Sequence, residues 1–284
     1  MSAFDPPAIA VREVVARALV EDLGVLGDIT SLAAIPADSV ASATFVARDE
    51  GVLAGSACVT ETFAQVDPAV VVRWQAGDGD PVEAQQILAT VEGCTRSVLA
   101  AERVALNLLC HLSGVATLTN RYVRATHGNT RILDTRKTTP GLRSMEKAAV
   151  RAGGGFNHRD SLSDAVLLKD NHLAVSGIAL AVERARSRWP GRMIEVECDH
   201  LDQVLEAAAA RVDRIMLDNM SPDDVRQAIA VINEAIGSKI PVEVSGRVAL
   251  DLVGQYAAAG ADFISVGALT HSAPVFDIGL DFGV

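Results

Sequence analysis

The stretch MIEVECDHLDQVLEAAAARVDRIMLDN, residues 193–219, contains the pattern that decides the fold. An apolar run ends in charged residues, a helical window follows at about 201–210, and a second apolar run ends in Asp218 and Asn219. Alternation of this kind predicts a parallel sheet covered by helices, either wound open or closed into a barrel. It recurs in further strand-like runs at RILD (131–134), AVLLKD (165–170), IPVEVS (240–245) and DFISVG (262–267), and in helical windows at about 175–188, 222–236 and 248–259.

The ends of these predicted strands favour the barrel. Each strand ends on, or just before, polar residues or glycine: Asp134 to Lys137, Lys169 to His172, Glu197, Asp218-Asn219, Ser245-Gly246, and Gly267 leading to His271. Parallel strands bring their carboxyl ends to one rim, and barrel enzymes carry their chemistry at that rim.

The first part of the chain has a different pattern. A helix is predicted at about 8–22, strands at 41–48 and 69–77, and a long helix from about 95 to the mid-120s that Ser113-Gly114 interrupts. We therefore predict an N-terminal α/β (α+β) domain over 1–111 and an α/β barrel over 112–272.

Composition excludes several classes of protein. The 284 residues are 49% hydrophobic, which suffices for a large core, and the net charge of -11 argues against a nucleic-acid binder. The four cysteines are widely spaced without a CxxC motif, so a disulfide framework or cysteine metal site is not expected. The N-terminus lacks the pattern of a signal peptide, and the longest uncharged stretch, 104–120, is too short to span a membrane. A cytoplasmic protein is predicted.

One segment is basic within this acidic chain. From Arg131 to His172 there are eight Lys or Arg residues against five Asp or Glu. Two like charges ~5 Å apart cost about 3 kcal/mol at an effective dielectric of 20, so a cluster of them requires carboxylates or bound anions. Spacing of four predicts that Arg143, Lys147 and Arg151 lie on a solvated helix face. The candidates for an anion pocket are then Arg136, His158, Arg159 and Lys169.

Carboxylates and glycines accompany this cluster. Glu197 and Asp218 end consecutive strands and suit an acid/base couple, a Mg²⁺ site or acceptors for ribose hydroxyls, although either residue can also cap a helix. Gly246 and Gly267 follow the last two strands, where barrels commonly bind phosphate, although a single glycine more often only makes a turn.

Longer motifs resemble a known family. DTRKTTPGLRSMEKAAVRAGGGFNHR (134–159) followed by LSDAVLLKDNH (162–172) closely resembles the quinolinate phosphoribosyltransferases, and EDLGVLGDITS, AERVALNLLCHLSGVAT, IEVE, MLDN, EVSG and VGALTHS are further matches. The resemblance implies an N-terminal α/β domain, an incomplete barrel, and a C-terminal tail (273–284) that returns to the first domain. It also implies transfer of phosphoribose from phosphoribosyl pyrophosphate to quinolinate, with loss of CO₂, to give nicotinate mononucleotide.

The resemblance assigns roles by motif. Arg136, His158, Arg159 and Lys169 resemble the quinolinate ligands, and Arg103 resembles an arginine that the partner subunit of a homodimer donates. Lys137 resembles a diphosphate contact, Glu197 and Asp218 resemble ribose or Mg²⁺ contacts, and Mg²⁺ itself is expected mainly on the diphosphate. The phosphate-binding elements correspond to Ser245, Gly246, Gly267 and His271. The catalytic set is Lys137, Lys169, Glu197 and Asp218, while Lys169 and water are both left open as proton donors after decarboxylation.

Two departures and three alternatives accompany this interpretation. Ala148 stands where an aromatic residue is expected, and Arg247 stands where a second glycine is common; we expect Arg247 to point to solvent. A phosphoribosyltransferase acting on nicotinate or another ring acid is the nearest alternative. A Schiff-base aldolase using Lys169 and a non-catalytic sensor of a phosphorylated metabolite are the others.

Overall fold

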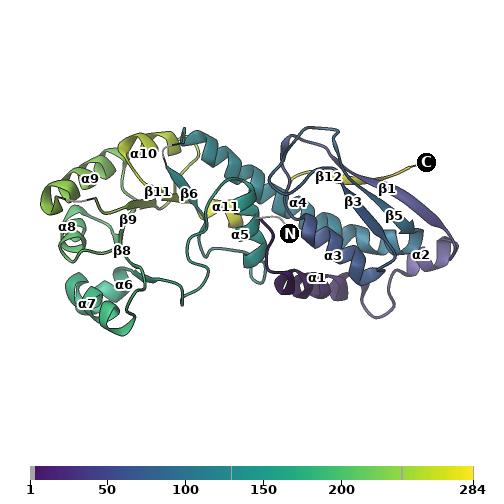
Figure 1. The fold of residues 1–284 in the computed structure, drawn as a ribbon, viewed down its shortest axis with the longest axis horizontal. Coiled ribbons are helices and arrows are strands. Elements are labelled where there is room, and N and C mark those ends of the chain that lie inside the picture. The colour runs from purple at the N-terminus through teal and green to yellow at the C-terminus, as the bar shows by residue number, and fades with distance from the viewer. Residues whose placement is uncertain (1–3, 129, 238, 284) are drawn as a thin grey trace. The chain divides into compact units, whose positions relative to one another are not determined.

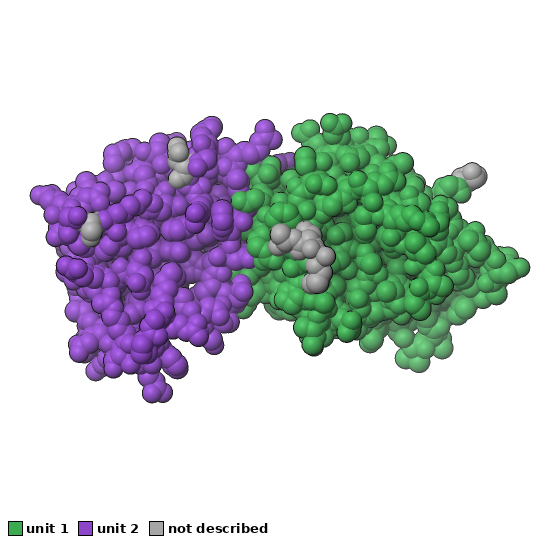
Figure 2. Space-filling view, in the orientation of Figure 1, with its two compact units in different colours: residues 1–120, 138–154, 268–284 green, residues 121–137, 155–267 purple. Residues whose placement is uncertain are grey.

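A computed structural model describes residues 4–128, 130–237 and 239–283. The chain forms two compact units (Figure 2). Unit 1 consists of residues 1–120, 138–154 and 268–284, and unit 2 of residues 121–137 and 155–267. The predicted domain boundary between residues 111 and 112 stays a prediction.

Unit 1 is built on an antiparallel sheet in the order β12-β1-β5-β3 (Figure 1). The C-terminal strand β12 pairs along β1, so the last segment of the chain completes the sheet that the first segment begins. The strands are β1 (Val40–Ala47), β3 (Val71–Trp74), β5 (Ile87–Cys94) and β12 (Ile278–Phe282), with a separate pair of β2 (Gly51–Val52) and β4 (Pro81–Val82). The helices are α1 (Ala8–Leu23), α2 (Ile29–Ala34), α3 (Ser56–Val66), α4 (Thr95–Ala125, which continues five residues into unit 2), α5 (Arg143–Ala152) and α11 (Ala268–His271).

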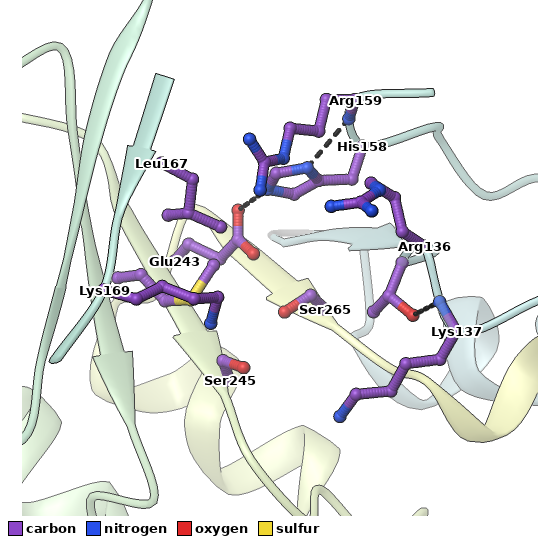
Figure 3. Close-up of a pocket in the computed structure, with 11 residues that line it drawn as sticks. Arg136, Lys137, His158, Arg159, Leu167, Lys169, Glu243, Ser245 and Ser265 are labelled. Atoms are coloured by element: carbon purple, nitrogen blue, oxygen red, sulfur yellow. Dashed lines mark hydrogen bonds and ion pairs between the residues drawn. The ribbon is translucent and has the colours of Figure 1, made fainter. Parts of the chain in front are cut away.

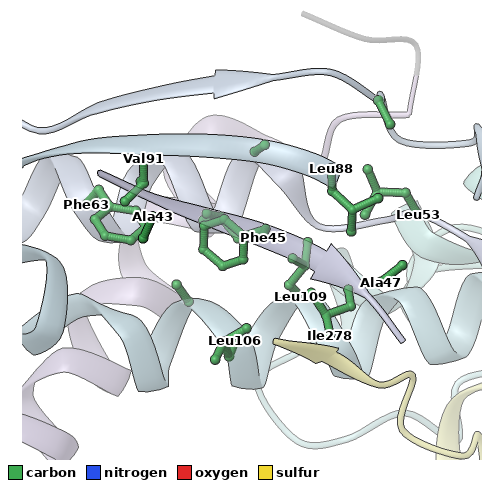
Figure 4. Close-up of a cluster of buried hydrophobic side chains, with 14 of the residues drawn as sticks. Ala43, Phe45, Ala47, Leu53, Phe63, Leu88, Val91, Leu106, Leu109 and Ile278 are labelled. Atoms are coloured by element: carbon green, nitrogen blue, oxygen red, sulfur yellow. The ribbon is translucent and has the colours of Figure 1, made fainter. Parts of the chain in front are cut away.

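The core of unit 1 lies between this sheet and its helices. Phe45 on β1 is fully buried and meets the ring of Phe63 edge to face, with 6.2 Å between centroids. Leu88 of β5 and Leu109 of α4 belong to the same buried cluster (Figure 4). Burying a side chain of this size contributes roughly 1.5–3 kcal/mol, so the cluster holds the sheet against α4.

Helix α4 runs without the predicted interruption at Ser113-Gly114. Ser113 is buried, and its hydroxyl bonds to the backbone N–H and carbonyl of Ala54, both at 3.1 Å. A Cβ on Gly114 would lie 2.1 Å from the carbonyl oxygen of Pro274, so glycine permits close packing rather than a break. The helix is long and apolar enough to cross a membrane by length and composition, yet 61% of its apolar window is buried within the structure, as in a core helix.

Helix α5 corrects a second expectation. Lys147 is 2% exposed, so the predicted solvated face is wrong at that position. Seven of the ten residues of α5 are buried, and of the others only Ser144 is fully exposed, so most of the helix lies in the interior. Ala148, one of the two departures, is among them, whereas Arg247 is exposed as expected.

Unit 2 is a parallel α/β barrel that is open on one side. Its six-stranded sheet has the order β6-β11-β10-β9-β8-β7, and β6 and β7 occupy opposite edges although they are consecutive in sequence. The helices α7 to α10 follow the outer side of the strands (Figure 1). The strands are β6 (Arg131–Leu133), β7 (Val166–Leu168), β8 (Ile194–Cys198), β9 (Arg214–Asp218), β10 (Val242–Ser245) and β11 (Phe263–Ser265). The helices are α6 (Asp170–Ser176), α7 (Ile178–Arg188), α8 (Leu201–Ala209), α9 (Pro222–Ile236) and α10 (Val253–Ala259).

Candidate active site

Alternation along the strands of unit 2 separates an apolar face from a polar one. Val196, Ile215 and Val244 are fully buried, and α8 packs against β8 and β9. Because successive side chains point to opposite faces, the other face receives the residues in between. These are Glu195 and Glu197 of β8, Arg214, Met216 and Asp218 of β9, Glu243 and Ser245 of β10, and Ser265 of β11.

A cavity of about 330 Å³ lies on this polar face. That volume is at the small end of the range for ligand sites, roughly 300–1,000 Å³. Side chains from several elements extend around it, with basic groups on more than one side (Figure 3). Its lining consists of Thr135, Arg136, Lys137, His158, Arg159, Leu167, Lys169, Met216, Glu243, Ser245 and Ser265. Six of the residues singled out from the sequence therefore share one cavity, including Arg136, Arg159 and Lys169.

A buried carboxylate brings two basic loops together. Asp134 is 0% exposed and follows β6. Its Oδ1 accepts the backbone N–H of His158 at 2.9 Å, and its Oδ2 accepts the side-chain amide of Asn157 at 2.5 Å. The backbone of Phe156 also pairs with β6. The loop carrying His158 and Arg159 is thereby held beside the loop carrying Arg136 and Lys137.

Both ring nitrogens of His158 have hydrogen-bond partners, which fix the orientation of the ring. Its Nδ1 accepts the backbone N–H of Arg159 at 2.8 Å, while Nε2 lies 3.1 Å from Glu195 Oε2 and 3.5 Å from Glu243 Oε2. The hydrogen-bond network assigns the proton of the neutral ring to Nε2. Burial disfavours the charged ring, but hydrogen bonds and charge from Glu195 and Glu243 outweigh burial and raise the pKa of His158 to about 9.

These two observations on His158 oppose each other, because a second proton on Nδ1 would break the bond from Arg159. One backbone hydrogen bond contributes about 1 kcal/mol, less than the influence of two adjacent carboxylates in a buried site. The bond from Arg159 therefore decides the tautomer of the neutral ring, and the two carboxylates decide the direction in which the pKa of His158 is shifted.

The arginines of the cavity carry repulsion that an anion would relieve. Burial, and then the positive charge of Arg136, lower the pKa of Arg159. Nη1 of Arg159 donates to the carbonyl of Ala165 at 3.0 Å, which fixes the guanidinium at the cavity. Guanidinium groups match carboxylate and phosphate geometry, so the pair suits a ligand with more than one anionic group.

Lys169 and Glu197 form an ion pair between the ends of β7 and β8. The Lys169 backbone N–H donates to Nδ1 of His172 at 3.0 Å, which holds the start of α6. Glu197 does not line the cavity itself, but it is paired with Lys169, which does.

Asp218 and Gly246 lie at the same rim, at the ends of β9 and β10. Ser245 pairs in register with Asp218, whose Oδ2 accepts the side-chain amide of Asn219 at 2.6 Å. Gly246 has a φ of +116°, and a Cβ there would lie 2.5 Å from Asn219 Oδ1. The turn and this close approach explain the glycine without a ligand, and its phosphate role stays a prediction.

Two predicted site residues belong to unit 1. Arg103 is exposed on α4, and His271, at the end of α11, pairs its Nδ1 with the hydroxyl of Ser272 at 2.6 Å. Gly267 is the last residue of unit 2. The roles of these three residues, like those of the cavity residues, stay predictions.

Sequence reasoning missed several residues of the cavity and the polar layer beside it. Glu243 lines the cavity, and Arg214 contacts it from the neighbouring strand at 2.7 Å. Strand alternation could have identified both residues, because Glu243 points to the same face of its strand as Ser245, and Arg214 to the same face as Asp218. The other missed lining residues are Thr135, Leu167, Met216 and Ser265.

The fold and this cavity define a class of protein: an α/β-barrel enzyme that binds a small polyanionic substrate at the carboxyl ends of its strands. Comparison with known families matches residues 115–281 to the C-terminal domain of quinolinate phosphoribosyl transferase and residues 28–113 to its N-terminal domain. The chain belongs to the quinolinate phosphoribosyltransferase family.

Individual relatives agree along nearly the whole chain. A nicotinate-nucleotide pyrophosphorylase [carboxylating] of Mycobacterium leprae is 42% identical over 96% of this chain and 97% of its own length. A probable enzyme of the same name from Bacillus subtilis is 40% identical over 96% and 93%. The solved structure of the nicotinate-nucleotide pyrophosphorylase from Francisella tularensis has a TM-score of 0.92 at 37% identity and covers 100% of this chain and 99% of that one.

Proposed function

We propose that the protein transfers phosphoribose from phosphoribosyl pyrophosphate to the ring nitrogen of quinolinate, with decarboxylation, in the de novo synthesis of NAD. The supporting observation is the cavity itself, in which Arg136, Arg159, Lys169 and His158 surround a space of about 330 Å³. Quinolinate carries two adjacent carboxylates, so each needs a cationic or hydrogen-bonding partner. Membership of the family supports the same reaction.

The reaction proceeds in two steps. The pyridine nitrogen attacks the anomeric carbon of the ribose, and the bond from that carbon to the diphosphate oxygen breaks. Positive character on the ribose is stabilised by carboxylates, a role we give to Glu197 and Asp218. Lys137 balances charge on the departing diphosphate.

The second step needs little from the protein. The ribosylated ring nitrogen is positively charged, so the electron pair of the breaking C2–carboxylate bond is stabilised at C2 until that carbon takes a proton. Arg136 and Arg159 hold the ring while CO₂ leaves. Lys169 is within the same cavity and, with water, is a candidate for the proton donor.

Mg²⁺ is proposed as the cofactor. Asp218 has a partly exposed carboxylate at the rim, and Glu197 lies on the neighbouring strand opposite Met216, two residues before Asp218. Oxygen donors of the kind Mg²⁺ prefers are therefore present. The ion would be held mainly by the diphosphate and would neutralise its charge.

We also propose a homodimer in which Arg103 of each subunit completes the active site of the other. A cytoplasmic location is proposed separately. Arg103 is exposed on α4, as a residue donated to a partner must be. Mixing an Arg103→Ala variant with an Arg136→Ala variant should restore activity, because one mixed site then has both arginines intact. Light scattering that shows a monomer, or mixing without recovery, contradicts the shared site.

The direct test supplies carboxyl-labelled quinolinate, phosphoribosyl pyrophosphate and Mg²⁺, and follows labelled CO₂. Nicotinate, the substrate of the alternative reaction, is supplied in parallel and should not be converted. Arg136→Ala should weaken quinolinate binding far more than phosphoribosyl pyrophosphate binding, while exposed Arg247→Ala should change neither. Equal loss of both substrates in Arg136→Ala contradicts the role given to Arg136.

A further inference from the structure

Four charged side chains form a buried layer beside the cavity: His158, Glu195, Arg214 and Glu243. Glu195 and Glu243 are each 0% exposed, and the side chain of Arg214 is 16% exposed. Nη1 of Arg214 lies 2.7 Å from Glu243 Oε2 and 4.0 Å from Glu195 Oε1. Only His158 of this layer belongs to the set of residues predicted from the sequence.

Glu243 creates an electrostatic problem for the proposed ligand. It lines the cavity, so a carboxylate faces the space proposed for a dianion. Its second oxygen, Oε1, is buried without a hydrogen-bond partner among the described residues. Burial raises the pKa of Glu243, but His158 and Arg214 more than offset this and hold the carboxyl ionised, with its pKa below the ordinary value.

Arg214 is placed to cancel that charge. Its guanidinium packs over the ring of Phe263 at 4.1 Å and meets Glu243 in a close ion pair, yet Arg214 does not line the cavity. His158 depends less on Glu243, because Glu195 is nearer to its ring at 3.1 Å and Asp134 holds its backbone. The arginine therefore acts on the cavity through Glu243.

We infer that Arg214 is a specificity-determining positioning residue, which neutralises Glu243 and so keeps the cavity attractive to an aromatic dicarboxylate. This inference rests on the proposed function. Arg214 touches no substrate, yet it controls the affinity of the cavity for the aromatic dicarboxylate.

The same cluster also has the composition of a cation site, since ligand atoms of His158, Glu195 and Glu243 lie within 4.8 Å of one another. Arg214 already supplies a positive charge at Glu243 Oε2, and a metal ion there would compete with it. Arg214 is therefore assigned as the counter-charge. One equivalent of divalent metal in the purified protein, lost in Glu243→Gln, would overturn that assignment.

The test measures quinolinate and phosphoribosyl pyrophosphate binding by calorimetry in Arg214→Met, Glu243→Gln and the double variant. At a separation of about 8 Å and an effective dielectric of about 20, one uncompensated charge weakens binding of an anionic group by roughly 30-fold. Arg214→Met should therefore weaken quinolinate binding at least about tenfold. The double variant should bind quinolinate within about threefold of the parent, because it removes both charges of the pair. Glu243→Gln leaves the positive charge of Arg214 and should bind quinolinate at least as tightly as the parent.

The controls separate charge from folding. Arg131, on strand β6, packs its guanidinium over the ring of Phe156. Arg131→Met removes that guanidinium and should leave quinolinate affinity unchanged. Arg214→Lys keeps the charge and should keep most of the affinity. If Arg214→Met does not fold, as its circular dichroism would show, Arg214→Gln replaces it as the variant that removes the charge, and the double variant is compared with that protein.

Each outcome has one meaning. Weak quinolinate binding in the double variant, equal to that of Arg214→Met, shows a packing role and overturns the inference. Unchanged binding in Arg214→Met overturns it as well. A parent protein that binds no quinolinate overturns the proposed function instead, so the two failures are distinguishable.

Discussion

Replacing Asp134 by asparagine tests the contact that assembles the cavity. The side chain is 0% exposed, and its donors include the backbone N–H of His158 at 2.9 Å and the amide of Asn157 at 2.5 Å. Asparagine has nearly the same shape but only one acceptor oxygen, and its NH₂ group faces the other donor. Losing one charge-assisted hydrogen bond costs about 1.5–3 kcal/mol, and a stranded buried donor costs about 1–3 kcal/mol more.

The free energy of unfolding should therefore fall by about 3 kcal/mol or more, measured by urea denaturation. Quinolinate affinity, measured by calorimetry, should fall at least about tenfold, because the loop that carries His158 and Arg159 is no longer fixed. Asp67→Asn is the matched control, since Asp67 also accepts one backbone N–H and one side-chain donor, but outside the site and near solvent. A loss of stability no larger than that of Asp67→Asn, or unchanged quinolinate affinity, would refute the reasoning.

Three further predictions concern packing, pH and metal. Gly114→Ala should lower the melting temperature although alanine is the better helix former, because its Cβ would meet the Pro274 carbonyl at 2.1 Å; an unchanged or raised melting temperature would contradict the packing argument. The folded-state pKa of His158 is raised from 6.5 to about 9, so its contribution to stability is complete below pH 6.5 and is lost as pH rises through 9. Unfolding free energies measured across this range should fall less in His158→Gln, and equal slopes would contradict the prediction. Removing divalent cations with EDTA should abolish CO₂ release without changing circular dichroism; full activity without Mg²⁺ would contradict the proposed cofactor.

Much of the polar rim was predictable because it depends on local pattern. Runs such as RIMLD and IEVEC contain the alternation that places apolar side chains on one face, and in a parallel sheet their carboxyl ends must share a rim. Arg136 and Lys169 follow predicted strands and could therefore be chosen before the structure was known, whereas His158 and Arg159 were chosen from the basic composition of the segment 131–172. The resemblance to the family added roles to these residues but no geometry.

Three other features could not be predicted from the sequence. Gly114 does not interrupt α4, and the glycine is explained by the close approach of Pro274, a residue 160 positions away that local helix propensity does not register. Lys147 looks like a surface residue by its spacing, and its burial follows only from the packing of α5 within unit 1. Likewise, the resemblance implied an incomplete barrel, but the place of its opening, between β6 and β7, is a property of the complete strand order.

The amino-acid sequence by itself determined the family, the alternation of strands and helices, and which basic residues gather after strand ends. The tertiary structure alone decided which charges compensate one another. Glu243 and Arg214 are 29 residues apart in sequence, and only the pairing of β9 with β10 brings them together. The physical reason is that hydrophobic patterning depends on near neighbours along the chain, whereas the electrostatics of a buried site depend on neighbours in space.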